Sequence, residues 1–295
     1  MNYKSGFVSL VGRPNVGKST LINYLLGEKI TITSVKPQTT RNQIKTIYHD
    51  KDRGQIVFVD TPGIHSPRNE LDNYMIQEVY QSLEGIDVII FMFDARHSWG
   101  KGDEFIKNQL KGIDLPILPV LNKIDQIKNK ELLKRHRDYS NKLEEEVIPI
   151  SARTGKNVDN LITKVFEILS EGPQYYPEEM VTDRIEQFIV SEFVREKIFK
   201  FTREEVPYGT AVVVEEFKER ENGKIFIRAN IYVEKKSHKR IIIGKKGSLI
   251  KKIGKRARHD VERLLNEDVY LDLWVKVQKD WRDDEHLLKR MGYNN

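Results

Sequence analysis

The sequence predicts an α/β domain with a mostly parallel sheet, followed by a smaller α+β domain. Three features carry this prediction. Over about the first 170 residues, apolar runs alternate with helix-like stretches, a pattern typical of parallel strands joined by helices. Two prolines and a glycine at 171–179 then interrupt all periodicity and indicate a short extended connection. Beyond it, the pattern changes to a helix, two strands, two helices and a final strand.

Composition excludes several classes of protein. The 295 residues include no cysteine, which rules out disulfides, thiolate metal sites and cysteine nucleophiles. No apolar run reaches the roughly 18 residues that a membrane-spanning helix requires. The N-terminus leads directly into an apolar run, so no signal peptide is expected. A cytoplasmic protein fits these features best.

The net charge of +6 is unevenly distributed. Residues 1–180 contain 24 Lys and Arg against 24 Asp and Glu, whereas residues 181–295 contain 26 against 20. The whole positive excess therefore lies in the second part. A neutral first part and a basic second part indicate different roles, the second involving a polyanion.

In the first part, the candidate site residues follow the apolar runs. Ligands of such folds bind at the carboxyl ends of the strands, so residues at these ends are expected to lie close together. The expected strands are 7–11, 56–59, 88–93, 117–121 and 147–150, and the expected helices are 20–26, 71–83, 104–110, 130–144 and 158–168.

The first apolar run ends in a phosphate-binding P-loop, with the pattern G-x-x-x-x-G-K-S between a strand and a helix. Gly12 and Gly17 allow the backbone to wrap closely around phosphates, and its N–H groups then point inward at a helix N-terminus. Lys18 can reach the β- and γ-phosphates, and the Ser19 hydroxyl can hold Mg²⁺. The residues expected at the phosphates are Gly12, Arg13, Pro14, Asn15, Val16, Gly17, Lys18, Ser19 and Thr20.

A D-x-x-G motif, Asp60-Thr61-Pro62-Gly63, closes the run at 56–59. A carboxylate at a strand end beside a P-loop can hold Mg²⁺ through water. The Gly63 N–H can bind the γ-phosphate and move away once that phosphate is lost. An isolated D-x-x-G is usually a turn, but its position after a P-loop favours the functional interpretation.

An N-K-x-D motif, Asn122-Lys123-Ile124-Asp125, follows the run at 117–121. A carboxylate that accepts from guanine N1–H and N2–H₂ rejects adenine, because adenine leaves the buried carboxylate unpaired. After a P-loop and a D-x-x-G, this motif predicts GTP rather than ATP. Ser151-Ala152-Arg153 follows the next run, and its backbone N–H groups are candidates to bind guanine O6.

The polar stretch Pro37-Gln38-Thr39-Thr40-Arg41 lies between the P-loop helix and the run at 44–48. A threonine hydroxyl here could complete the coordination of Mg²⁺ when GTP is bound, and such loops relax on hydrolysis. Ser19, Thr40 and Asp60 are therefore the expected metal ligands. Lys18, Thr40, Asp60 and Gly63 are the residues expected to carry catalysis.

The ordered set of P-loop, Q-T-T-R, D-T-P-G, N-K-I-D and S-A-R resembles a translation-factor-class GTPase, close to the branch that contains the Era, EngA and MnmE families. The resemblance covers about residues 1–170. It implies a six-stranded sheet with five helices and the roles given above. Thr40 resembles the Mg²⁺ ligand of the switch loop, and Thr39 remains an alternative that spacing does not exclude.

One position departs from the pattern of Ras-like GTPases. They carry a glutamine after the D-x-x-G glycine, where it orients the attacking water, whereas this chain has Ile64. An apolar side chain cannot position water, so slow intrinsic hydrolysis is expected. In some members of the resembling branch, an asparagine at the position of Asn15 helps to bind K⁺. Activation by K⁺ is therefore a hypothesis for this chain.

The second part begins with an amphipathic stretch at 183–200, for which Thr182 is the expected N-cap. Strands are expected at 211–217 and 225–233, because Asn222-Gly223 between them is a hairpin signal. A helix then follows to about residue 265, after the G-x-x-G element. A strand at 269–277 and a short helix at 281–290 complete this part.

A G-K-K-G element is the candidate nucleic-acid site. Gly244 and Gly247 lack Cβ atoms, which lets a nucleic-acid backbone approach, and Lys245 and Lys246 supply charge there. From 235 to 259 there are 11 Lys and Arg and no acidic residue, an electrostatic footprint for phosphates. An apolar groove beside it is expected from Ile242, Ile243, Leu249, Ile250 and Ile253. The expected RNA-binding residues are Ile242, Ile243, Gly244, Lys245, Lys246, Gly247, Ser248, Ile250 and Lys251.

The order of these elements around I-I-I-G-K-K-G-S-L-I-K-K-I-G resembles a KH domain of the second topology, over about 183–280. We thus expect a GTPase domain at 1–172, a linker at 173–182, a KH domain at 183–280 and a C-terminal helix and tail at 281–295.

A GTPase domain followed by a KH domain resembles the Era family of bacterial GTPases. That resemblance implies binding of single-stranded 16S rRNA near its 3′ end, association with the small (30S) ribosomal subunit, and release controlled by GTP. It also implies a monomer with peripheral contact to the inner membrane. The KH domain has no motif for cutting RNA, so no nuclease activity is expected. Two alternatives remain: an RNA chaperone with a vestigial GTPase, and a membrane-trafficking or cell-cycle GTPase whose basic domain binds anionic lipid.

Overall fold

The computed structural model describes residues 3–33, 36, 39–63, 67, 69–221 and 223–293. The chain forms two compact units. The first comprises Met1–Thr31, Thr40–Ser66 and Met75–Asp183, and the second comprises Ile32–Thr39, Pro67–Tyr74 and Arg184–Asn295. The segment predicted to be a linker, 173–182, thus lies within the first unit.

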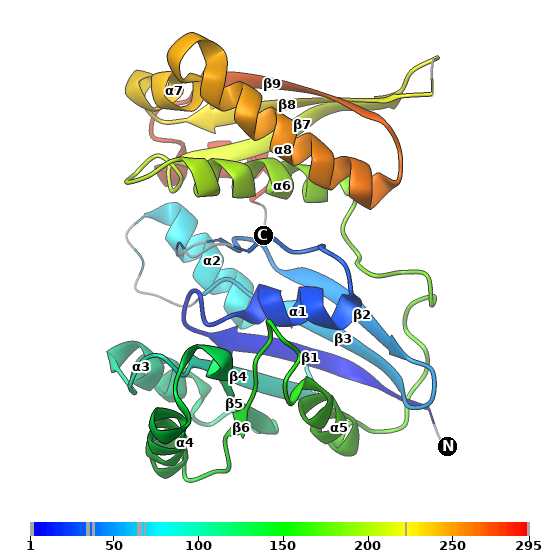
Figure 1. The fold of residues 1–295 in the computed structure, drawn as a ribbon, viewed down its shortest axis with the longest axis vertical. Coiled ribbons are helices and arrows are strands. Elements are labelled where there is room, and N and C mark those ends of the chain that lie inside the picture. The colour runs from blue at the N-terminus through cyan, green and yellow to red at the C-terminus, as the bar shows by residue number, and fades with distance from the viewer. Residues whose placement is uncertain are drawn as a thin grey trace. The chain divides into compact units, whose positions relative to one another are not determined.

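The first unit contains a six-stranded sheet with the strand order β2-β3-β1-β4-β5-β6 (Figure 1). Strand β2 runs antiparallel to β3, and the other neighbouring pairs are parallel. The carboxyl ends of β1, β3, β4 and β5 therefore meet at one edge, as the sequence predicts. The strands are β1 (Lys4–Gly12), β2 (Ile44–Asp50), β3 (Gly54–Asp60), β4 (Val88–Asp94), β5 (Ile117–Asn122) and β6 (Ile148–Pro149).

Helices cover both faces of this sheet, because successive side chains of its buried strands point to opposite sides. On β4, Val88, Ile90 and Met92 pack in one core with residues of α1 and α5. Ile89 and Phe91 pack in a second core with residues of α3 and α4. The helices are α1 (Lys18–Leu26), α2 (Glu70–Gln81), α3 (Lys101–Leu110), α4 (Asn129–Leu143) and α5 (Val158–Ile168).

The second unit contains a three-stranded sheet with the order β7-β8-β9, in which β7 and β8 are antiparallel and β8 and β9 are parallel. Alternate residues of β8, such as Ala229, Ile231 and Val233, pack against residues of α6 and α8. The elements are α6 (Glu186–Phe201), β7 (Thr210–Glu219), β8 (Ile225–Val233), α7 (Lys236–Ile243), α8 (Ser248–Leu265), β9 (Val269–Val277) and α9 (Glu285–Arg290). The predicted fold, a P-loop α/β domain followed by a KH domain, is confirmed.

Two local predictions in the second part are wrong. Thr182 does not cap a helix, because α6 begins at Glu186. The Thr182 hydroxyl instead donates to the carbonyl of Lys45, at 2.8 Å, beside a bridge between Thr182 and Thr46. The expected C-terminal helix is also divided, into a 3-10 turn at Trp281–Asp283 and α9. Asp284 separates them, and its carboxylate caps α9 by accepting from two backbone N–H groups.

Within these described ranges, no helix combines the length and the hydropathy that crossing a bilayer requires.

His238 on α7 makes the stability of the second unit depend on pH. The residue is 8% exposed. Burial lowers the pKa of His238 below its ordinary value, and the nearby charge of Lys235 lowers it further. Nδ1 of His238 has no hydrogen-bond partner among the described residues. The other charged groups that act on it are Glu234, Arg282 and Glu205.

In the unfolded chain, His238 has the ordinary histidine pKa. As the pH falls, His238 is therefore protonated in the unfolded chain at a higher pH than in the folded chain. The stabilisation from neutral His238 is present above about pH 6.5 and is lost as the pH falls toward the lowered folded pKa. We expect the urea midpoint to fall more for the wild type than for His238→Gln between about pH 7.5 and about pH 5.5. Equal falls in both proteins would contradict this prediction.

Candidate functional site

The P-loop connects β1 to α1, and its backbone requires two glycines. Gly17 has φ of 111°, and a Cβ there would lie 2.2 Å from Nδ2 of Asn122. A Cβ on Gly12 would lie 2.5 Å from the carbonyl oxygen of Met92 on β4. Asn15 is also left-handed, with φ of 65°. The loop therefore has the tight, partly strained backbone that a phosphate cradle needs.

Lys18 is the first residue of α1 and is 6% exposed. Its Nζ donates to the carbonyl of Gly12 at 3.3 Å, so the amine is held across the mouth of the loop. Burial lowers the pKa of Lys18, and the charge of Asp60 opposes that shift. A cation held here, beside the N-terminus of a helix, suits the phosphates of a nucleotide.

Asp60 ends β3 and is fully buried, and burial raises its pKa despite the opposing charge of Lys18. Its Oδ2 accepts from the Ser19 hydroxyl at 2.7 Å and from the Thr40 hydroxyl at 3.5 Å. The two hydroxyl oxygens lie 3.2 Å apart. Oδ1 of Asp60 has no hydrogen-bond partner among the described residues. This corner thus gathers a carboxylate and two hydroxyls, the hard oxygen donors that fit Mg²⁺ with several waters retained.

The two adjacent threonines have different surroundings. The Thr40 hydroxyl lies at the Ser19–Asp60 corner, whereas the Thr39 hydroxyl donates to the carbonyl of Lys36 at 2.8 Å. The geometry therefore favours Thr40 over Thr39 as a metal ligand. Pro37 and Gln38 of the same predicted loop lie outside the described residues, as does Ile64.

Gly63 approaches the P-loop closely. A Cβ at Gly63 would lie 2.7 Å from Cγ and 2.8 Å from Cα of Pro14. The Thr61 hydroxyl donates to the carbonyl of Leu10 on β1 at 2.7 Å, which fixes the start of the D-x-x-G turn, and Pro62 is buried. Gly63 is therefore beside the loop that would hold the phosphates.

Asp125 is held by the S-A-R tripeptide. The Ser151 hydroxyl donates to Oδ1 of Asp125 at 2.7 Å, and the Arg153 guanidinium pairs with Oδ2. The N–H groups of Ser151 and Ala152 donate inside the protein, to Lys156 O at 3.0 Å and to Asn122 Oδ1 at 2.9 Å. If either of these N–H groups binds guanine O6, it must share or replace the hydrogen bond that it makes here.

Asn122, at the end of β5, is hydrogen-bonded to the P-loop and to the S-A-R tripeptide. It is 1% exposed, and its Nδ2 donates to the carbonyl of Val16 at 2.8 Å, while its Oδ1 accepts from Ala152. Val16 is itself buried in the core shared by α1 and α5, and Thr20 continues α1. The sequence predicts that Asn122 binds the nucleotide, and its two hydrogen bonds show that it also connects the P-loop to the segment at Ala152.

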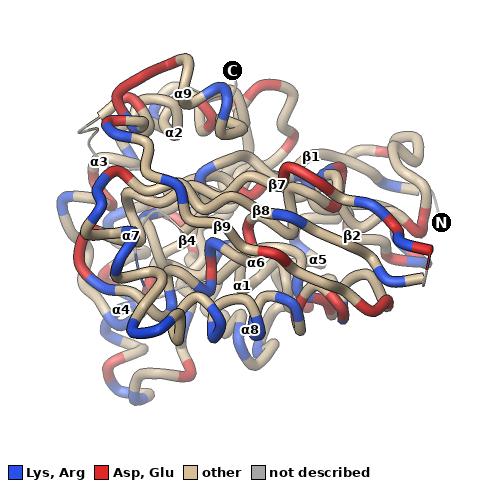
Figure 2. The backbone as a smooth tube through the Cα atoms, turned by 90° about the horizontal axis from the view of Figure 1, so that it is seen from above, with Lys and Arg blue, Asp and Glu red and all other residues tan. Residues whose placement is uncertain are grey.

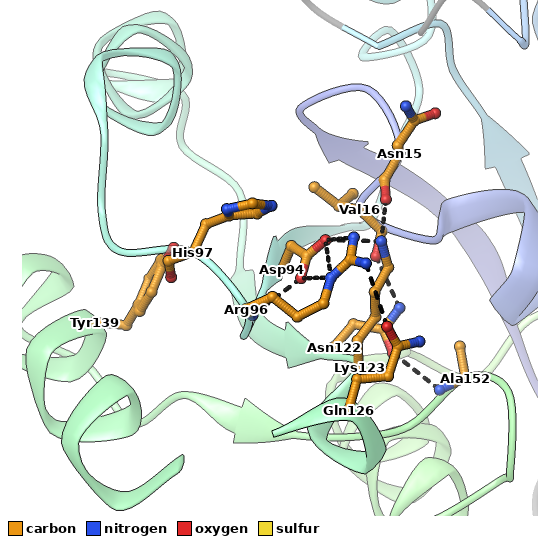
Figure 3. A network of polar contacts seen from close by, with 10 residues as sticks. All are labelled: Asn15, Val16, Asp94, Arg96, His97, Asn122, Lys123, Gln126, Tyr139 and Ala152. Atoms are coloured by element: carbon orange, nitrogen blue, oxygen red, sulfur yellow. Dashed lines mark hydrogen bonds and ion pairs between the residues drawn. The ribbon is translucent and has the colours of Figure 1, made fainter. Parts of the chain in front are cut away.

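Lys123 extends from β5 across to the P-loop (Figure 3). Its Nζ donates to the carbonyl of Asn15 and, at 2.7 Å, to Oδ2 of Asp94. Asp94 in turn accepts from the guanidinium of Arg96, whose NH1 reaches Oε1 of Gln126 at 3.2 Å. Sequence reasoning missed Asp94 and Arg96, although a carboxylate at the end of the run at 88–93 was the available signal.

The Arg13 side chain does not line the phosphate cradle. Its NH1 pairs with Oδ2 of Asp103 on α3 at 3.2 Å, and Asp103 is 2% exposed. A Cβ on Gly102 would lie 3.1 Å from Nε of Arg13, so the guanidinium packs on the start of α3. Arg13 can thus serve a nucleotide through its backbone, while its side chain ties the P-loop to α3.

In the second unit, the G-K-K-G element joins α7 to α8. Gly244 has φ of 73°, and a Cβ there would lie 2.8 Å from both N and Cβ of Leu249. Gly247 has φ of 78° with open space where its Cβ would be. Lys246 is left-handed as well, with φ of 50°. Gly244 is needed for packing, and Gly247 leaves the outer side of the loop open to a ligand. Ser248 begins α8 and is exposed, like Lys245 and Lys251.

The basic run at 235–259 is mostly exposed, and Figure 2 shows cationic segments along α7 and α8. Of its eleven cations, ten are exposed and Lys239 is half-buried. Among the described residues, Arg258 is the one that pairs with a carboxylate, Glu262 at 3.4 Å. The charge of this run is therefore available to an external polyanion.

The predicted apolar groove is partly wrong. Ile242 and Ile253 are fully buried in the core of the second unit, so their side chains cannot line a groove. Ile243, Leu249 and Ile250 are half-buried against that core and remain accessible. The helical periodicity that marks a groove also marks a core, and sequence alone does not separate the two.

Comparisons with known proteins agree with this geometry. A family model described as "50S ribosome-binding GTPase" matches residues 7–123, and a KH domain model matches residues 205–282. GTPase Era of Halothermothrix orenii is 62% identical over 293 residues, which cover 99% of each chain. GTPase Era of Alkaliphilus oremlandii is 51% identical over 296 residues, all of both chains.

Solved structures are similar over the same length. Era in complex with MgGDPNP and nucleotides 1506–1542 of 16S ribosomal RNA is 42% identical, with a TM-score of 0.96 over 99% of this chain and 100% of that chain. A variant of Aquifex aeolicus Era bound to GDP and AlF₄⁻ is 43% identical, with a TM-score of 0.95 and the same coverage.

The fold and the site together define a P-loop GTPase that carries a KH domain. It hydrolyses GTP to GDP and phosphate. The chain belongs to the Era family of GTPases, because full-length relatives of that name are 50–62% identical to it.

Proposed function

We propose that this GTPase is a GTP-controlled switch that binds the single-stranded 3′ region of 16S rRNA through its KH domain during assembly of the 30S subunit. The observation that carries the proposal is the exposed run of cations around the G-K-K-G loop, whose charge is largely unpaired. KH modules clamp a few nucleotides at such a loop. The related Era that is solved with nucleotides 1506–1542 of 16S rRNA supports this choice of RNA.

We assign the GTPase domain to 1–172 and the KH domain to 183–280. In the first, Lys18 and the loop backbone bind the phosphates, and Asp125 reads guanine. Ser19, Thr40 and Asp60 are the residues that would hold Mg²⁺, which supplies charge neutralisation at the phosphates. The Gly63 N–H would bind the γ-phosphate. In the second, Lys245, Lys246 and Lys251 bind RNA phosphates, and Ile243 and Ile250 contact bases.

The switch segment supports control of RNA binding by GTP. The Thr39 carbonyl accepts from the Arg195 guanidinium, and the Thr33 N–H donates to Oε1 of Glu196 at 3.2 Å. All four residues belong to the second compact unit. The next residue, Thr40, lies at the Asp60 corner of the first unit. A change at the γ-phosphate would therefore act on Thr40, the residue that directly follows this segment in the chain. For such a switch, RNA must bind the two nucleotide states with different affinity.

Intrinsic hydrolysis is expected to be slow because Ile64 cannot orient water, and we propose that K⁺ bound near Asn15 supplies the missing charge. We expect a higher kcat in K⁺ than in Na⁺ at the same ionic strength. A multiple-turnover assay measures kcat, and equal rates in the two salts would refute the role of K⁺.

The same assay tests the alternative of a vestigial GTPase. That alternative is excluded if the wild type turns over GTP repeatedly and Lys18→Ala abolishes this turnover.

The chain is proposed to act as a cytoplasmic monomer with peripheral contact to the inner membrane. Anionic lipid is the alternative ligand for the basic run. A competition experiment between RNA and anionic vesicles shows which of them this run binds more tightly. A short single-stranded RNA should displace the protein from anionic vesicles at concentrations where an uncharged polymer does not. Vesicles that displace the RNA while RNA fails to displace the vesicles would favour the lipid-binding alternative.

A further inference from the structure

Two non-glycine residues of the predicted nucleotide-binding motifs have left-handed backbone conformations. Asn15 of the P-loop has φ of 65°, and Lys123 of the N-K-x-D motif has φ of 68°. This conformation is uncommon outside glycine, although asparagine adopts it more readily than lysine does. Contacts that hold these two residues in place would therefore help to fix the shape of the site.

One side chain connects these two residues. Nζ of Lys123 donates to the carbonyl oxygen of Asn15, so the left-handed residue of one loop fixes the carbonyl of the other (Figure 3). The Lys123 side chain is 17% exposed. A lysine has four flexible methylene groups, and ordering them is costly unless the ammonium has a fixed acceptor.

Asp94 provides that acceptor, and it is rigidly held. It ends β4, where it pairs in register with Asn122 of β5. Its Oδ2 lies 2.7 Å from Nζ of Lys123, and it also accepts from Nε, NH2 and the backbone N–H of Arg96 at distances of 2.7–3.2 Å. Its side chain is 10% exposed. These bonds outweigh burial and lower the pKa of Asp94, so the carboxylate stays charged.

We propose that Asp94 is a positioning residue of the GTPase site: through Lys123 it fixes the Asn15 carbonyl and the backbone of the P-loop, and so sets how slowly guanine nucleotides leave. Its carboxylate acts through the Lys123 ammonium, whose other contact is the P-loop itself. Arg96 holds the Asp94 carboxylate from the other side and plays a supporting part.

A purely structural interpretation is that Asp94 is a partly buried ion-pair partner that stabilises the end of β4. That interpretation predicts lower stability with unchanged nucleotide release. Positioning instead predicts a specific change in nucleotide release and in KM. It also predicts that the effect disappears once Lys123 is gone, because the carboxylate then has nothing to position.

The test is a double-mutant cycle on the full chain, with the dissociation rate of a fluorescent GDP as the readout. Asp94→Asn keeps the shape and removes the charge, and we expect it to raise the rate about tenfold or more, as for loss of a charged hydrogen bond. Lys123→Met should raise the rate at least as much. The double variant should be no faster than Lys123→Met alone. In steady-state assays, Asp94→Asn should raise KM for GTP while kcat stays within about twofold.

Asp87 offers a matched control, because it lies just before β4 and its carboxylate accepts from the Phe7 N–H at 2.7 Å. Asp87→Asn should leave nucleotide release unchanged. Asp94→Glu retains the charge, and the flexible lysine can follow it, so this variant should release GDP at close to the wild-type rate. If Asp94→Asn does not fold, the GDP release rate of Asp94→Glu still tests the proposal.

Three results would overturn the proposal. The first is an Asp94→Asn variant that melts earlier but releases GDP at the wild-type rate. The second is a double variant in which the two effects multiply. The third is an Asp94→Glu variant that folds but releases GDP as fast as Lys123→Met.

Discussion

Replacing Asp125 with asparagine should convert this GTPase into an enzyme that prefers xanthosine triphosphate. Guanine presents donors at N1 and N2 to the carboxylate, whereas xanthine carries an acceptor at the second position, which an asparagine amide can satisfy. A site built around a fixed polar partner discriminates strongly, so affinity for GTP should fall by about a thousandfold or more. Competition of GTP and XTP against a fluorescent guanine nucleotide measures the reversal.

The matched control is Asp138→Asn, which makes the same change on the exposed side of α4. It should leave the preference for GTP unchanged. In Asp125→Asn, the Ser151 hydroxyl and the Arg153 guanidinium would lose their charged partner. The fold should survive because Asn122 still braces Val16 and Ala152. An Asp125→Asn enzyme that still prefers GTP over XTP would show that another group reads the base.

Reversing the charge of Lys245 and Lys246 together, to aspartate, should abolish most RNA binding while GTP hydrolysis without RNA is retained. Both side chains are exposed at the open side of the loop, and neither Gly244 nor Gly247 is altered. We expect affinity for a short single-stranded RNA to fall by about tenfold or more. The slope of log affinity against log salt concentration should decrease in magnitude by about two. A salt titration of fluorescence anisotropy measures both quantities.

Lys224→Asp with Lys279→Asp makes the same charge change elsewhere in the second unit, where both lysines are exposed beside carboxylates of their own. This pair should lower RNA affinity far less than the loop variant. If both pairs weaken binding equally, the overall charge attracts RNA and the G-K-K-G loop has no special part.

Much of this fold was predictable from the sequence, because strands of the first sheet such as β3 and β4 are fully buried apolar runs, and β9 is rich in residues that favour strands. The run at 117–121 corresponds to β5 at Ile117–Asn122, and the run at 269–277 coincides with β9. The rule that ligands bind at carboxyl ends of parallel strands then placed Asp60 and Asp125 at one edge. Continuous apolar runs and local motifs carry this information without knowledge of distant contacts.

The contacts that depend on distant residues were not predictable. Thr182 has the composition of an N-cap, yet its hydroxyl binds Lys45, 137 residues away in sequence. Asp94 lies at the end of an apolar run, as Asp60 does. Only the structure shows that the Asp94 carboxylate accepts a hydrogen bond from the Lys123 ammonium. Ile242 fits a groove and a core equally well until its burial is known. Local pattern sets the elements, and long-range partners decide what their side chains do.

The central claim is that nucleotide state controls RNA binding. It is tested most directly by the affinity for a short single-stranded RNA with the sequence of the 16S rRNA 3′ end, measured with GDP and with a non-hydrolysable GTP analogue at fixed salt. We expect tighter binding with the GTP analogue, and loss of that binding in the Lys245→Asp, Lys246→Asp variant. Equal affinity in the two nucleotide states would contradict the claim, because a ligand that binds both states equally shifts neither.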